Sequence, residues 1–170
     1  MKSLKIAFFG SSLVSAYWNG AATYYRGIIE ALHRLGHRIT FYEPDAFDRR
    51  QHRDFDEVPY ARSVVFAPRK EDVFDCLSRA SAADVIVKCS GVGVFDALLE
   101  EAVLQLRSPD KLVIFWDVDA PAALDRVESR PMDPFRRCIP QYDLIFTCGG
   151  GPLVIERYTR LGARRCIPIY

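Results

Sequence analysis

Short, largely apolar runs alternate with segments of helical periodicity along most of the chain, and this alternation limits the folds open to it. Helical patterns follow Gly20, span residues 70–81, run from Ala97 to about Arg107 and follow Pro152. The apolar runs are residues 5–10, 38–42, 63–67, 84–89, 111–116, 142–147 and 165–170. Strands of a parallel sheet are apolar along their length because helices cover both faces. The pattern predicts an α/β fold: a doubly wound, mostly parallel, Rossmann-like sheet with helices on both faces.

The most polar segment, residues 43–60, predicts a surface loop with one helical turn. The chain has no internal repeat, and 170 residues suit a single domain. Ligands of doubly wound sheets bind outside the carboxyl ends of the strands. We therefore expect a site among the loops that follow residues 10, 44, 90, 116 and 148.

Composition excludes several classes of protein. A formal charge of +1 argues against binding of nucleic acid through the overall field, and no apolar run approaches the roughly 20 residues that span a bilayer. The N-terminus lacks the pattern of a secretory signal peptide. The five cysteines are widely spaced and form no CxxC pair, which favours reduced thiols in a cytoplasmic protein without a metal site.

The first candidate site is the long loop from Gly10 to Gly20. Most strand-to-helix loops have two to six residues, and a longer one is often functional. Ser11, Asn19 and Gly20 are the candidate substrate-binding residues, because the helix that follows offers free N–H groups to a phosphate or a hydroxylated ligand. Alternatively, Asn19 caps that helix.

The second candidate is a pair of carboxylates, Asp117 and Asp119, at the end of a predicted strand. Alternate residues of an extended segment point the same way, so the two could orient sugar hydroxyls, act as a general base or share a metal. The alternative is that Asp119 caps a helix with Pro121 near its first position.

The third candidate is the run Gly149, Gly150 and Gly151 before Pro152. Three glycines between a strand and a helix let the backbone approach a ligand and form an anion-binding nest, although a tight turn would also explain them. Other signatures are missing: there is no P-loop, no G-x-S-x-G elbow and no histidine at the expected edge. Gly91 and Gly93 match a dinucleotide fingerprint only in part, since Asp96 takes the place of its third glycine.

Several segments together resemble a known family. They are residues 18–27 (WNGAATYYRG), 31–32, 35–43, Phe115–Pro121 (FWDVDAP), residues 142–147 with the glycine run and Pro152, and residues 162–168. In order and over nearly the whole chain, they resemble bacterial glycosyltransferases of the spore-maturation-protein type, which are GT-B enzymes of the glycosyltransferase family 1/4 kind.

The resemblance implies that residues 1–170 are the amino-terminal, acceptor-side domain, and that the donor-binding domain is absent because the chain is either a fragment or a naturally short relative. The whole enzyme would move a sugar from a nucleotide-sugar donor to an acceptor hydroxyl. It would need no metal or other cofactor. Asp117 or Asp119 would be the base, the glycine run would lie near the donor phosphates, and the isolated domain would be inactive.

Two other functions stay open at this point. One is a non-catalytic small-molecule binding or regulatory domain of flavodoxin-like or receiver-like type, although Gly10-Ser-Ser lacks the acidic residues of a receiver. The other is a self-associating domain that forms a homodimer through its exposed cleft face. The partner expected from the leading hypothesis is a small-molecule or glycan acceptor, with no nucleic acid and no membrane span.

Overall fold

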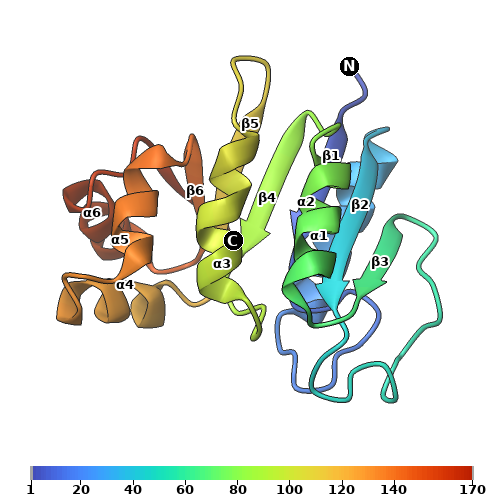
Figure 1. Ribbon diagram of the computed structural model, residues 1–170. Helices are drawn as coiled ribbons and strands as arrows, with labels where there is room; N and C mark the ends of the chain where they lie inside the picture. Colours follow the sequence, from blue (N-terminus) through green and yellow to red (C-terminus); the bar gives the residue numbers. More distant parts are fainter. Residues whose placement is uncertain (1, 170) are drawn as a thin grey trace.

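A computed structural model describes residues 2–169 and shows a seven-stranded, wholly parallel sheet (Figure 1). The strand order is β3-β2-β1-β4-β5-β6-β7, so the order reverses between β1 and β4. The strands are β1 (Lys5–Phe9), β2 (Arg38–Pro44), β3 (Arg62–Phe66), β4 (Val85–Cys89), β5 (Leu112–Asp117), β6 (Leu144–Cys148) and β7 (Cys166–Ile169). The predicted Rossmann-like fold class is confirmed.

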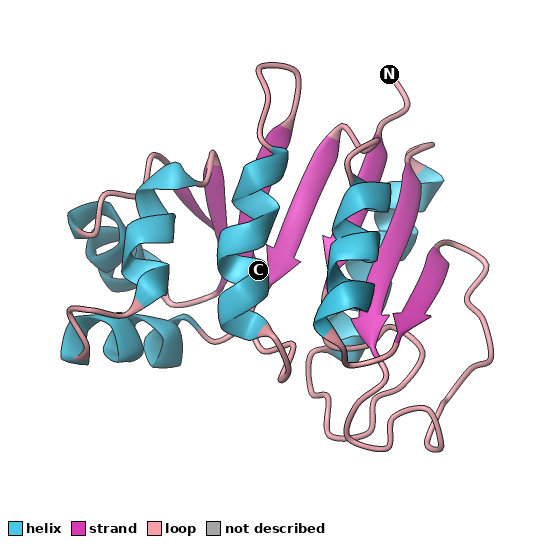
Figure 2. Cartoon of the chain, viewed as in Figure 1, coloured by secondary structure: helices cyan, strands magenta, loops and turns pink. Residues whose placement is uncertain are grey.

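Six α-helices connect these strands within the described residues (Figure 2). They are α1 (Ala22–Arg34), α2 (Lys70–Ala80), α3 (Asp96–Ala102), α4 (Ala120–Ser129), α5 (Pro134–Cys138) and α6 (Gly151–Arg160). Two short 3-10 turns, Val103–Leu106 and Ile139–Gln141, follow α3 and α5. None of the helices in residues 2–169 has the length and apolar character needed to cross a bilayer.

The two faces of the sheet carry separate apolar clusters. One cluster joins the sheet to residues of α2, α3, α4, α5 and α6. Among residues 2–169, α1 is the one helix that contributes to the other cluster, through Tyr25 and Ile29 among others. This cluster extends over β5 and β6 to Trp116 and the half-buried Phe146. Helices therefore lie on both faces, as predicted, but unevenly.

Residues 45–61 differ from the sequence expectation. They contain hydrogen-bonded turns, such as His52 N–H to the Asp48 carbonyl, but no helix. The segment is also more than a surface loop, because Arg49 and the preceding Glu43 are buried. Arg49 donates to the Ser11 carbonyl at 2.9 Å, and Glu43 near the end of β2 accepts hydrogen bonds from Leu13 N–H at 2.6 Å and from the Ser12 hydroxyl at 3.1 Å. These residues hold the loop after β1 in place.

Candidate functional site

The carboxyl ends of β1, β4, β5 and β6 lie side by side at one edge of the sheet (Figure 1). Adjacent strands are about 4.8 Å apart, so the row from β1 to β6 spans about 14 Å. The candidate residues that follow these strands therefore share one edge, which is where doubly wound folds bind ligands.

A cavity of about 250 Å³ opens at this edge between the ends of β4 and β5 and the helices α3 and α4. Phe115, Val118, Ala122 and Ala123 form its apolar lining. Its polar lining consists of Ser90, Asp96, Glu100, Asp119 and Arg126. We call it the β4–β5 cavity. Three carboxylates and one guanidinium around an apolar base suit a ligand with hydroxyl groups and a compact apolar body.

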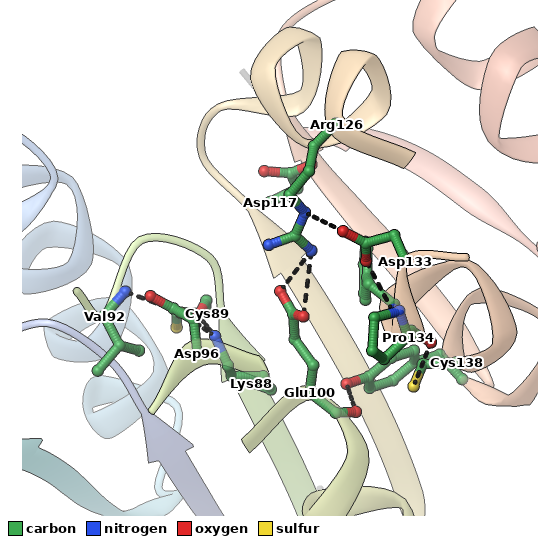
Figure 3. Close-up of polar contacts among 12 residues, drawn as sticks. Lys88, Cys89, Val92, Asp96, Glu100, Asp117, Arg126, Asp133, Pro134 and Cys138 are labelled. Atoms are coloured by element: carbon green, nitrogen blue, oxygen red, sulfur yellow. Dashed lines mark hydrogen bonds and ion pairs between the residues drawn. The ribbon is translucent and has the colours of Figure 1, made fainter. Parts of the chain in front are cut away.

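An ion pair between a buried lysine and a partly buried aspartate supports one wall of this cavity. The side chain of Lys88 is fully buried on β4, and its Nζ donates to Asp96 Oδ1 and to the Cys89 carbonyl, each at 2.6 Å (Figure 3). Asp96 also accepts from Gly93 N–H at 2.8 Å and from Val92 N–H at 3.2 Å. Burial raises the pKa of Asp96, but Lys88 and these N–H groups hold it below its ordinary value. The pair therefore fixes the turn from β4 into α3.

A second charge cluster joins α3 to α4 beside the cavity. Arg126 on α4 binds both carboxylate oxygens of the buried Glu100, at 3.0 and 3.1 Å, and its Nε lies 3.4 Å from Asp133 Oδ2 (Figure 3). Burial raises the pKa of Glu100, although Lys88 and Arg126 oppose that shift. In residues 2–169 no group of three or more His, Cys, Asp or Glu side chains is placed to hold a metal ion.

Asp117, one of the two predicted catalytic carboxylates, is fully buried. One of its oxygens accepts a hydrogen bond from the hydroxyl of Tyr158 on α6, and the other accepts a hydrogen bond from Asp119 N–H at 3.0 Å. Burial raises the pKa of Asp117 above its ordinary value. With its oxygens occupied in the interior, Asp117 ties β5 to α6, and it is the less suitable of the two carboxylates to meet a ligand.

Asp119 lies near Asp117 in an exposed setting and lines the β4–β5 cavity. It occupies the N-cap position of α4, yet its side chain makes no capping hydrogen bond. The alternative expectation that Asp119 caps a helix is therefore correct for its position, but its side chain does not form the capping hydrogen bond. Its carboxylate is the one at this edge that is both exposed and part of the cavity wall.

Replacing Asp117 with asparagine should change how stability depends on pH. A carboxyl with a raised pKa in the folded protein contributes stability that is fully present below its unfolded pKa and is lost as pH rises through the folded value. The wild type should therefore lose stability relative to Asp117→Asn as pH rises from about 3.8 toward neutrality. Thermal unfolding of both proteins across that range measures the difference. If the stability of the two proteins changed with pH in the same way, Asp117 would not carry a buried charge.

Ser11 and Asn19, both predicted to bind substrate, form a hydrogen bond with each other inside the loop after β1. The Ser11 hydroxyl donates to Asn19 Oδ1 at 2.7 Å, and Asn19 Nδ2 donates to the carbonyls of Ser12 and Ser15. Asn19 makes no side-chain cap on α1. These two residues shape the loop from within, whereas Gly20 is exposed with open space beside its Cα.

The three glycines after β6 adopt positive φ angles of 76°, 83° and 58°. A Cβ on Gly149 or Gly151 would meet open space, whereas one on Gly150 would collide with Val154. The run thus turns tightly into α6 and leaves free room beside its first and last residues. That geometry is compatible with the predicted nest for an anion.

Another hollow, of about 220 Å³, lies at the opposite edge near the amino ends of β1 and β2. Lys5, Arg38 and Arg79 line it, and none of the described residues in its lining carries a carboxylate. The β4–β5 cavity is the stronger site because it lies at the carboxyl edge and contains an exposed acid.

Sequence reasoning missed four buried or half-buried charges at this edge: Lys88, Glu100, Arg126 and Arg49. One signal was available, since a lysine inside an otherwise apolar strand requires a buried partner. Glu100 is 26 residues from Arg126, and Arg49 is 31 residues or more from the carbonyls to which it donates, so no local spacing reveals these contacts.

Neither protein-family profiles nor curated protein sequences match this chain. Solved structures do match. An alpha-glucosyltransferase in complex with UDP and a mismatched 13-mer DNA aligns with a TM-score of 0.53 and 16% identity, over 86% of this chain and 37% of its own. Glycyrrhiza uralensis UGT73P12, complexed with glycyrrhetinic acid 3-O-monoglucuronide, aligns with a TM-score of 0.53 and 10% identity, over 96% and 48%. The C-terminal domain of the Coenzyme A biosynthesis protein CoaBC aligns with a TM-score of 0.46 and 11% identity, over 77% and 71%.

These matches concern the fold. The sheet and helices are arranged like a Rossmann-like domain of GT-B glycosyltransferases, and the chain spans less than half the length of the two glycosyltransferases. Activity does not follow from fold alone, so it has to be argued from the site.

Proposed function

We propose that this domain forms the acceptor side of a GT-B glycosyltransferase of the spore-maturation-protein type, with residues 1–170 as one wall of a two-walled cleft. The observation that carries the proposal is the exposed carboxylate of Asp119 on the β4–β5 cavity. The GT-B-like fold supports the same reading, because both aligned glycosyltransferases contain such a domain within a longer chain.

In the proposed reaction, an acceptor hydroxyl lies within reach of Asp119. Its oxygen bonds to the anomeric carbon of the donor sugar, the bond from that carbon to the nucleotide phosphate breaks, and Asp119 receives the hydroxyl proton. The leaving diphosphate carries the electron pair of the broken bond. Gly149, Gly150 and Gly151 are proposed to lie near those phosphates, where backbone N–H groups stabilise negative charge.

The remaining predicted residues take supporting roles in this proposal. Asp117 holds the end of β5 against α6, while Ser11 and Asn19 set the shape of the loop floor beside Gly20. We propose that donor recognition belongs mainly to a second domain. The isolated chain is then expected to show no efficient sugar transfer, measured as release of UDP from UDP-glucose in the presence of saccharide acceptors. Turnover at ordinary enzyme rates by the chain alone would contradict the proposal that donor recognition belongs mainly to a second domain.

Binding tests the site directly. Backbone amide NMR spectra should shift for residues near Asp119 and Gly91 when methyl glycosides are added, and Asp119→Asn should weaken that binding about tenfold. Asp110→Asn is a matched control, because Asp110 is an exposed carboxylate that precedes β5 at the opposite edge. Tight binding of flavin mononucleotide, or no saccharide shift at this edge, would instead favour a different binding domain.

A further inference from the structure

Trp18 is the most exposed aromatic side chain described in this chain, at 81%. Its backbone has a φ of 47°, a left-handed conformation that is uncommon for a bulky residue. Three other non-glycine residues in the described chain share positive φ: Phe47, Asp48 and Phe95. All four lie in loops that follow β1, β2 and β4, so unusual backbone geometry is concentrated at the proposed ligand edge.

The loop beneath Trp18 is held rigidly. Arg49 is buried, and it donates through Nη1 to the Ser11 carbonyl at 2.9 Å and through Nη2 to the Trp18 carbonyl at 3.4 Å. Its guanidinium carbon lies 5.1 Å from the centre of the Phe47 ring. The Arg49 Nε atom is buried without a partner among the described residues. The buried Arg49 guanidinium therefore holds the loop after β2 against the loop after β1.

The neighbouring residues complete this support. The Tyr17 ring stacks on His52 with ring centres 4.0 Å apart, and it meets the Trp18 ring edge-on at 6.1 Å. The Ser15 hydroxyl donates to the His52 carbonyl at 2.7 Å. Figure 2 shows the loops after β1 and β2 gathered beyond the sheet at this edge. The indole is thus presented to solvent from a loop that is ordered on its inner side.

The surroundings of Trp18 distinguish among ligands. The loop after β2 exposes charged and polar groups, including Asp48, Arg50 and His52, together with the aromatic rings of Phe47 and Phe55. Tyr17, next to Trp18, is also exposed, and Gly20 has open space beside it. A protein partner of ordinary size would need a broad apolar patch. Here the exposed aromatic residues alternate in sequence with charged and polar ones, and Trp18 is the most exposed of them. This mixture fits a ring that has an apolar face and hydroxyl groups at its edge, as a pyranose has.

We propose that Trp18 is a stacking platform for a sugar ring of the acceptor, with Arg49 as the residue that positions it. This inference rests on the proposed function, because it assigns a substrate class, a saccharide, to the same ligand edge. Trp18 contacts the ring and sets specificity, while the proton transfer stays with Asp119.

The two tryptophans make the test clean. Trp116 is buried and its Nε1 donates to the Tyr24 hydroxyl at 3.2 Å, so its indole N–H signal serves as an internal reference for that of Trp18. Methyl glycosides of glucose, galactose and N-acetylglucosamine should shift the Trp18 indole signal and leave that of Trp116 unchanged. Trp18→Ala should weaken binding about tenfold, as loss of an aromatic stacking partner does, and Trp18→Phe should weaken it less.

The outcomes separate the two proposals. If methyl glycosides shift amides near Asp119 but bind Trp18→Ala as well as the wild type, the platform is wrong and the proposed function stands. If no glycoside shifts any signal at this edge, both fail. If uridine shifts the Trp18 indole and glycosides do not, the platform binds a nucleobase and the saccharide assignment is overturned. Trp18 broadening with protein concentration alone would assign the surface to a second copy and overturn it too.

Discussion

Replacing Lys88 with methionine is expected to lower the free energy of unfolding by about 3–5 kcal/mol. The Lys88 ammonium is fully buried and bonds Asp96 Oδ1 and the Cys89 carbonyl, each at 2.6 Å. Methionine matches the volume of lysine but leaves the partly buried Asp96 carboxylate without its cation. Chemical denaturation at pH 7 measures the loss, and Lys70→Met, at an exposed position on α2, should change stability by less than about 0.5 kcal/mol.

A second substitution separates charge pairing from packing. Lys88→Met combined with Asp96→Asn should recover much of the loss, because asparagine still accepts from Gly93 N–H without a charge to compensate. The gap between wild type and Lys88→Met should also narrow in acid. Asp96 has a lowered pKa in the folded wild type, so its contribution is present above about 3.8 and is lost as pH falls through the folded value. A double variant no more stable than the single one would show that Lys88 acts through packing alone.

The fold was predictable because its signal is repeated along the chain. Every strand of the sheet overlaps a predicted apolar run, and the glycines at 36 and 162 mark helix ends with positive φ. Between Asp117 and Tyr142 the sequence offers a helix only as the alternative in which Asp119 caps one near Pro121, whereas both α4 and α5 form there. Four prolines interrupt the periodicity of this stretch, and α5 has only five residues, so the pattern is too short to identify.

The candidate site was predictable in position and only partly in role. Asp117 and Asp119 were expected to share one environment as alternate residues of an extended segment. The strand ends at Asp117, and Asp119 has φ −142° and ψ 59°, so one carboxylate is buried and the other exposed. The sequence places Ser11 and Asn19 in a loop at the expected ligand edge. The hydrogen bond between their side chains depends on how that loop folds, and no sequence pattern indicates it.

Replacing Gly150 with alanine is the other change expected to have a large effect, a loss of about 2–5 kcal/mol. A left-handed conformation costs an alanine about 1–2 kcal/mol. The added Cβ would also collide with the Val154 side chain, whose own Cβ would lie only 2.9 Å away, and such overpacking costs about 1–3 kcal/mol. Thermal and chemical unfolding measure the total.

The neighbouring glycines supply matched controls, because Gly149 and Gly151 have positive φ but open space beside them. Gly149→Ala and Gly151→Ala should each lose only the conformational part, about 1–2 kcal/mol, and stay folded. Gly20→Ala, without positive φ and without neighbours, should be nearly neutral. If the run also holds the donor phosphates, the two milder variants should weaken pyrophosphate binding while α6 remains formed, because a methyl group would occupy the space the anion needs. Equal pyrophosphate affinity in wild type, Gly149→Ala and Gly151→Ala would reduce the run to a turn that starts α6.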